Sequence, residues 1–190
     1  MKIYVVDNGG QWTHREWRVL KYLDVETKII PNHTPFDQID VDALVLSGGS
    51  PHVGVEAEKM GCQGDYLNKA NFPILAICAG MHFMATHFGG RVEAAKLPEF
   101  GKATLYIDEE DDLFRSLPEQ FTVWESHNDE VTFVPDSFQI LAHSDNCPAE
   151  SLKKKDRPFY GLQFHPEVEN TEHGYEIFKN FLRVVDEWKR

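Results

Sequence analysis

The chain has 190 residues, of which 42% are hydrophobic, and a formal net charge of −12 at pH 7. This length and hydrophobic content allow one substantial core, so we expect one domain over residues 1–190. An acidic surface repels phosphates, and the one short basic cluster, Lys153 to Lys155, is expected to be a solvated turn, so binding to nucleic acid is not expected.

Membrane insertion and an oxidising compartment are both disfavoured by the sequence. No stretch approaches the roughly 20 apolar residues of a membrane-spanning helix, and residues 1–6 favour a strand over a signal peptide, so we expect a cytoplasmic protein without a membrane partner. Cys62, Cys78 and Cys147 are odd in number, widely spaced and form no C-x-x-C pair. This spacing predicts reduced thiols and no metal site.

Short β-rich runs alternate along the chain with longer segments of helical pattern. The predicted strands of this kind are residues 2–6, 26–30, 43–46, 74–77 and 159–163, with a helix over residues 12–23 between the first two. Shorter alternating segments at residues 103–107, 121–125 and 138–142 indicate an antiparallel flank. The last helix is predicted over residues 174–188, with Thr171 as its cap. The fold class predicted is α/β, with one open, mostly parallel twisted sheet, helices on both faces and an antiparallel flank.

Cys78 follows the apolar run of residues 74–77 and precedes a small-residue turn into a predicted helix. The first amides of such a helix point back at the thiol and favour its ionised form. A lone cysteine after an apolar strand more often packs in the core. The flanking Gly80, together with His165 and Glu167 after a distant strand, favours a nucleophile with its base and orienting acid.

Two glycine pairs follow predicted strands, at residues 7–11 and 47–51. Open α/β sheets bind ligands at the carboxyl ends of their strands, so these turns and Cys78 are expected at one rim. Neither pair matches a dinucleotide or P-loop motif, and the second favours an oxyanion loop because glycine lets a backbone amide approach a reacting carbonyl. His165-Pro166-Glu167 is similar to the H-x-E of zinc deaminases, but no P-C-x-x-C follows it, which excludes that metal site.

Together these motifs resemble the triad-type, or class I, glutamine amidotransferases, and among them the separate glutaminase subunits of two-subunit GMP synthases. The similar segments span nearly the whole chain: residues 7–11, 46–49, 77–80, 126–129 and 161–168. The resemblance implies that Cys78 is the nucleophile that attacks the side-chain amide of glutamine, that His165 activates it, and that Glu167 orients His165.

The resemblance also implies the surroundings of the triad. The backbone amides of Gly49 and Ala79 would hold the oxyanion, while Ser126 and His127 would contact the α-amino and carboxylate groups of glutamine through backbone and side-chain groups. Asp129 would communicate with the partner. That partner would be the ATP-pyrophosphatase (synthetase) subunit, which converts XMP to GMP with ATP and Mg²⁺, so no cofactor is expected in this chain.

The chain departs from the family pattern at two positions. The nucleophile motif of the family is usually C-x-G-x-Q, whose glutamine helps to bind the substrate, but here His82 takes that place. Ser50 separates Gly49 from Pro51, where the family usually has S-G-G-P. The alternatives are a glutaminase subunit of another synthetase, of the anthranilate or aminodeoxychorismate type, and a regulatory subunit that has lost glutamine turnover.

Overall fold

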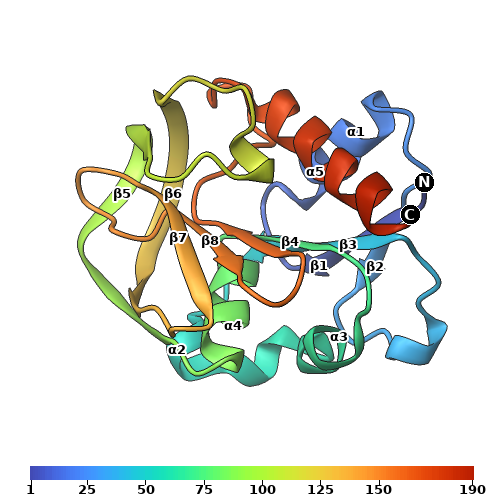
Figure 1. Ribbon diagram of the computed structural model, residues 1–190. Helices are drawn as coiled ribbons and strands as arrows, with labels where there is room; N and C mark the ends of the chain where they lie inside the picture. Colours follow the sequence, from blue (N-terminus) through green and yellow to red (C-terminus); the bar gives the residue numbers. More distant parts are fainter.

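A nine-stranded mixed sheet runs through the molecule, which a computed structural model describes over residues 1–190 (Figure 1). Its parallel strands are β1 (Ile3–Asn8), β2 (Ile29–Pro31), β3 (Ala43–Gly49), β4 (Ile74–Ile77) and β9 (Phe159–Leu162). Antiparallel pairing adds β5 (Arg91–Ile107), β6 (Gln120–Phe133), β7 (Phe138–His143) and β8 (Ser151–Lys154). The strand order is β2-β1-β3-β4-β9-β8-β7-β5-β6.

Helices cover both faces of the parallel strands. In Figure 1, α1 (Thr13–Tyr22) and α5 (Gly174–Trp188) lie above the sheet, and α2 (Val53–Glu56), α3 (Gln63–Lys69) and α4 (Ala79–His87) lie below it. Short 3₁₀ turns occupy residues 36–38, 57–60 and 112–114. None of these helices combines the length and the apolar character needed to cross a membrane.

The core explains why the central strands are continuous apolar runs. In β3, Val45 packs into the apolar cluster that includes Phe178 of α5, whereas the adjacent Leu44 packs into the cluster that includes Met81 of α4. Successive side chains of a strand point to opposite faces, so a strand with helices on both sides is apolar at every position. The predicted fold class is confirmed.

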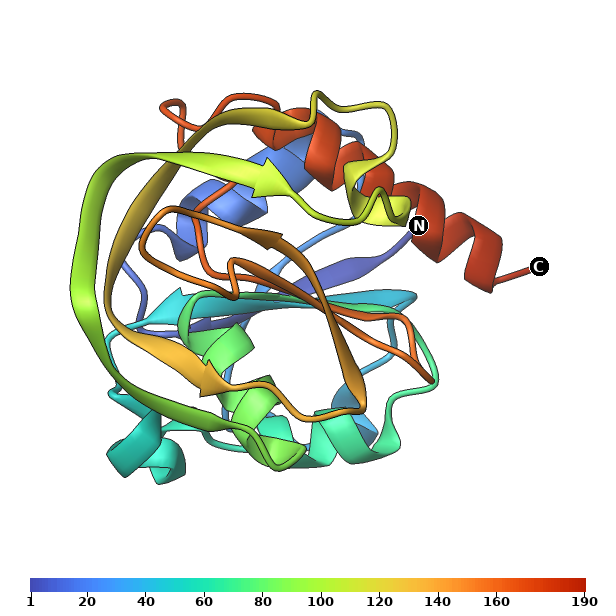
Figure 2. The ribbon, with the colours of Figure 1, turned by 60° about the vertical axis from the view of Figure 1, so that its left-hand side comes forward.

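The strands of the antiparallel flank are longer than predicted, and β2 is shorter. Figure 2 shows β5 and β6 as a long, curved pair at one end of the molecule. Their pairing shifts register between residues 91 and 92 and between residues 94 and 99, and such irregularities increase the bend of a strand. The curve brings the middle of β6 beside the carboxyl ends of the parallel strands, where Ser126 borders the same cavities as Cys78.

The prediction that Lys153 to Lys155 form a solvated turn is wrong, because the first two belong to β8. Lys153 Nζ donates to Asp111 Oδ2 at 2.7 Å. Lys154 is only 5% exposed, and its Nζ lies 4.7 Å from the centre of the Phe88 ring. A long lysine side chain packs along apolar surface while its charge contacts an acid or an aromatic face, so a basic run can form a strand.

Helix α5 has the bounds predicted, Gly174 to Trp188, but Thr171 does not cap it. The cap position is His173, whose φ of 59° is in the left-handed region. The Thr171 hydroxyl instead donates to the His165 carbonyl at 2.6 Å and accepts from Trp124 N–H at 3.0 Å. Thr171 therefore ties the segment after β9 to β6, beside the candidate site.

Candidate active site

Cys78 occupies the sharp turn between β4 and α4. It is the cap residue of α4, with φ 48° and ψ −109°, a conformation that costs energy for a residue other than glycine. Gly80 makes the turn possible, since a Cβ at this position would lie 2.5 Å from the Leu46 carbonyl oxygen. The turn sets the thiol at the carboxyl edge of the sheet with 7% of the residue exposed.

His165 and Glu167 lie just after β9, the strand that pairs with β4. His165 Nδ1–H donates to Glu167 Oε1 at 2.6 Å, which leaves Nε2 free to exchange a proton with a neighbouring group. The indole of Trp12 packs edge-on against the imidazole, with ring centres 4.4 Å apart. The backbone is fixed as well, because His165 N–H donates to the Trp124 carbonyl at 3.0 Å.

Electrostatics favours a charged imidazole at His165. Burial opposes the charge, but the Glu167 carboxylate and the neighbouring Cys78 outweigh burial, so the pKa of His165 is raised well above its ordinary value. An imidazolium beside a thiol is the arrangement that keeps a thiolate available as a nucleophile.

The predicted oxyanion segment begins inside β3, which extends to Gly49. Gly48 lies against the triad, because a Cβ there would be 3.1 Å from His165 Cε1. Asn8 fixes the segment by donating its side-chain amide to the Ser47 carbonyl at 2.8 Å. Only Ser50 and Pro51 of the predicted loop lie outside the strand. Ala79 is the first residue of α4, so its N–H has no acceptor within the helix.

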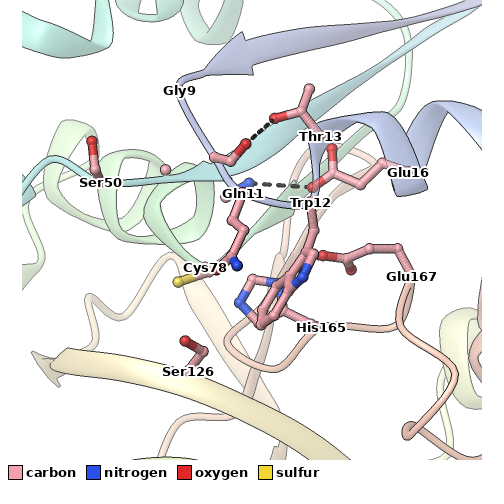
Figure 3. A pocket seen from close by; sticks show the side chains of 13 residues that line it. Gly9, Gln11, Trp12, Thr13, Glu16, Ser50, Cys78, Ser126, His165 and Glu167 are labelled. Atoms are coloured by element: carbon pink, nitrogen blue, oxygen red, sulfur yellow. Dashed lines mark hydrogen bonds and ion pairs between the residues drawn. The ribbon is translucent and has the colours of Figure 1, made fainter.

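Cys78 borders two cavities. The larger, of about 310 Å³, is lined by His165 and Glu167 and by Gln11 and Trp12 (Figure 3). The smaller, of about 190 Å³, lies toward α4 and β6. Its lining includes Cys78, Asp129 and all five residues predicted to contact the substrate: Gly49, Ala79, His82, Ser126 and His127.

His82 is buried, and its ring is already engaged by the protein. Its Nε2 lies 2.7 Å from Gln163 Oε1, and Gln163 Nε2 lies 3.7 Å from Cys78 Sγ. Burial lowers the pKa of His82 to about 4, so the neutral ring donates its Nε2–H to the amide oxygen. Gln163 is absent from the predicted site residues, although its place at the end of a strand, two residues before His165, is a signal that could have found it.

β6 carries Ser126, His127 and Asp129 within four positions of one another. The His127 ring donates Nδ1–H to the Asp129 carbonyl at 3.0 Å, and its Nε2 lies 3.3 Å from Glu99 Oε2. Both ring nitrogens therefore contact protein groups, and the substrate contacts expected of His127 stay a prediction. Asp129 Oδ2 lies 2.8 Å from Nδ1 of the exposed His52.

Glu16 is a second residue that sequence reasoning missed. It is 1% exposed, and its Oε1 accepts the Gly48 N–H at 3.3 Å. Burial and the charge of Glu167 raise its pKa well above the ordinary value. The carboxyl group of Glu16 therefore holds the end of β3 beside the triad.

This combination of a strained cysteine, a histidine–glutamate pair and glycine-rich strand ends has a direct counterpart among known proteins. The family model of the class-I glutamine amidotransferases matches residues 4–185. The chain belongs to this family. The motif-based resemblance is thereby confirmed.

Relatives of this amidotransferase match it over all or nearly all of its length. It is 50% identical over 190 residues to one subunit of the glutamine-hydrolyzing GMP synthase of Thermoplasma acidophilum, a match that covers 100% of this chain and 95% of the relative. The corresponding GMP synthase subunit of Methanocaldococcus jannaschii is 46% identical over 186 residues, which are 96% of each protein. A crystal structure of a GMP synthase subunit from Thermoplasma acidophilum matches with a TM-score of 0.95 and 49% identity, covering 100% of this chain and 96% of that one.

Proposed function

We propose that this chain, as one amidotransferase domain over residues 1–190, is the glutaminase subunit of a GMP synthase. It hydrolyses glutamine to glutamate and passes the ammonia to a synthetase subunit. The observation that carries the proposal is the cavity of about 190 Å³ that Cys78 lines together with the predicted substrate contacts, while His165 and Glu167 line the second cavity that Cys78 borders. The names of the full-length relatives support the same assignment.

The proposed chemistry proceeds in two steps. The Cys78 thiolate attacks the side-chain carbonyl carbon of glutamine, and the His165 imidazolium gives its proton to the departing nitrogen, so that ammonia leaves and a γ-glutamyl thioester remains. Water, deprotonated by His165, then attacks the thioester and releases glutamate and the Cys78 thiol. Glu167 keeps the imidazole in the tautomer that exposes Nε2 to the reacting atoms.

Each tetrahedral intermediate carries a negative oxygen, which the Gly49 and Ala79 amides would stabilise. Well-aimed donors of this kind contribute about 3 to 4 kcal/mol to the transition state. Ser126 and the backbone of His127 border the cavity where the α-amino and carboxylate groups of glutamine would lie. His82 would act through Gln163, because its Nε2–H is already donated to that amide.

The partner would be the ATP-pyrophosphatase subunit, which activates XMP with ATP and Mg²⁺ and accepts the ammonia to form GMP. The glutaminase chemistry itself needs no cofactor in this chain. Asp129 and the exposed His52 are hydrogen-bonded at the side of the substrate cavity, and this pair is the proposed point of communication with the partner.

Coupling has a chemical reason, since ammonia released into water is protonated and loses its nucleophilic lone pair. We would measure glutamate release by the chain alone, with the synthetase subunit, and with that subunit plus ATP and XMP. The expected result is an activity that rises through this series, with GMP formed from glutamine. Full activity of the lone chain would contradict partner gating, and transfer of nitrogen to a chorismate-type synthase instead would identify the other class of partner.

A further inference from the structure

A second group of titratable side chains lies buried in the antiparallel half of the molecule, outside the triad. Side-chain atoms of Glu99, His127 and Glu150 that could bind a metal ion, namely carboxylate oxygens and an imidazole nitrogen, lie within 4.8 Å of one another. All three residues are buried. Glu99 is on β5, His127 is on β6, and Glu150 immediately precedes β8. The cluster therefore joins three segments that are far apart in the sequence.

Two carboxylates in and beside this cluster, those of Glu150 and Glu125, lack the hydrogen-bond partners that buried charges require. Glu125, on β6, is 1% exposed, and neither of its oxygens has a hydrogen-bond partner, although Oε2 lies 3.5 Å from His127 Nε2. Both oxygens of the fully buried Glu150 are also unpartnered. The ion pairs of Glu99 and Glu125 involve only His127, so no lysine or arginine balances them. Buried carboxylates are otherwise found paired or coordinating a metal ion.

His127 has the orientation of a metal ligand. Its Nδ1–H is donated to the Asp129 carbonyl at 3.0 Å, which directs the lone pair of Nε2 toward the carboxylates. Nε2 lies 3.3 Å from Glu99 Oε2 and 3.5 Å from Glu125 Oε2. In a tetrahedral zinc site with bonds of about 2.0–2.2 Å, two ligand atoms lie roughly 3.3–3.6 Å apart.

Glu99 is also held from outside the cluster, as metal-ligating carboxylates usually are. The Ser144 hydroxyl donates to its Oε1 at 3.0 Å, and Asn146 Nδ2 lies 3.3 Å from the same oxygen. Ser144 and Asn146 also line an open cavity of about 450 Å³. Since Asp108, Glu109 and Asp145 line the same cavity, it would attract cations and give them a route to Glu99.

We infer that Glu99, Glu125, His127 and Glu150 form a structural site for a divalent metal ion of the Zn²⁺ type, bound through His127 Nε2 and carboxylate oxygens. Imidazole and carboxylate together suit zinc and its neighbours in the first transition row. Without the ion, the cluster keeps protons instead: burial raises the pKa of Glu150 well above its ordinary value and that of Glu125 to about 7. Binding would release these protons, and the ion would fasten β5 and β8 to β6, which carries Ser126.

The test is a Zn²⁺ titration of the full chain by calorimetry, in the Cys78→Ala variant so that the triad thiol cannot bind the metal. We expect one Zn²⁺ per chain and, at a hundredfold excess over Kd, a melting temperature higher by roughly 5 to 10 °C. Glu150→Gln, which keeps the side-chain shape, should weaken binding by at least about 100-fold and abolish the thermal shift. The matched control is His143→Gln, which removes the exposed His143–Asp108 pair at the cavity and should leave binding unchanged.

X-ray absorption of the zinc-loaded Cys78→Ala chain gives a second result that does not depend on the folding of Glu150→Gln. One imidazole with oxygen ligands supports the site. Absence of stoichiometric binding, two or more imidazoles around the ion, or equal affinity in Glu150→Gln would overturn it and leave a cluster that holds protons only.

Discussion

The side chains of His82 and Gln163 are joined by a buried hydrogen bond of 2.7 Å. Because the ring donates Nε2–H to the amide oxygen, the amide nitrogen is turned toward Cys78 Sγ, 3.7 Å away. Here, where the family usually has glutamine, the chain uses a neutral histidine to fix the orientation of a donor to the nucleophile. We therefore expect His82 to act on the reaction by positioning Gln163.

The first prediction concerns substitutions of His82. His82→Gln keeps a donor for Gln163 and should hold kcat/KM of the assembled complex within a few fold. His82→Leu frees the Gln163 amide to turn its oxygen toward the thiolate, and should lower kcat/KM roughly 10- to 100-fold, less than the loss of a full oxyanion donor.

The rate of alkylation of Cys78 by iodoacetamide separates positioning from packing in these variants. It should fall in His82→Leu and stay unchanged in His82→Gln. Equal alkylation rates and equal kinetics in the two variants would show that His82 only fills space in α4.

The second prediction concerns stability in acid. The unfolded chain protonates His82 at about pH 6.5, whereas in the folded chain burial lowers its pKa to about 4. The unfolded state therefore binds more protons between these values, and the folded state loses stability as the pH falls through this window, by on the order of 3 kcal/mol at most. Urea unfolding of the chain and of His82→Gln at pH 7, 6, 5 and 4 measures this, and parallel stability curves would contradict the burial of a neutral ring.

The third prediction concerns Glu167, whose charge keeps His165 protonated. Glu167→Gln should lower kcat roughly 10²- to 10⁴-fold, because the imidazole loses its charged acceptor and an amide nitrogen can donate to Nδ1 and favour the wrong tautomer. The pKa of His165 is raised by this carboxylate, so activity that needs the imidazolium is present below that pKa and is lost as the pH rises through it. The alkaline limb of kcat/KM should therefore move to lower pH in the variant. Glu169→Gln, an exposed neighbour, is the control, and an unmoved alkaline limb in Glu167→Gln would contradict this role.

The fourth prediction uses a pair of substitutions at Glu16. Burial and the charge of Glu167 raise the pKa of Glu16 well above its ordinary value and so favour the protonated side chain, and we expect Glu16→Gln to keep both activity and stability. Glu16→Ala leaves the buried Gly48 N–H without an acceptor and should lower the free energy of unfolding by about 1–3 kcal/mol. Equal damage by both substitutions would mean that the site requires the charge.

The parts of the fold that could be predicted have local causes. The strand before Cys78 is a continuous apolar run, and α5 carries an apolar stripe at helical spacing, so β4 matches its predicted bounds and so does α5. The Lys153 to Lys155 prediction failed because the partners of these side chains, Asp111 and the Phe88 ring, come from distant segments. No local pattern contains that information.

The candidate site divides in the same way. Cys78 and His165 could be found because strand ends carry ligands in open sheets. The burial of Glu16 beside Glu167 depends on how α1 packs, and the hydrogen bond between His82 and Gln163 joins residues 81 positions apart. Tertiary packing decides such pairs, so the sequence alone could not predict that His82 contacts Gln163.

Covalent labelling of the assembled complex by a glutamine-mimicking electrophile, read by peptide mass spectrometry, tests the central claim most directly. Cys78 borders both cavities, and His165 lines the larger of them. Cys147 is fully buried, and burial raises the pKa of its thiol. Cys62 lines neither cavity. We predict that label is found on Cys78 alone, in step with the loss of glutaminase activity, and that Cys78→Ala is neither labelled nor active with glutamine. Labelling of Cys62 or Cys147 at an equal rate, or glutaminase activity retained in Cys78→Ala, would contradict the proposed function.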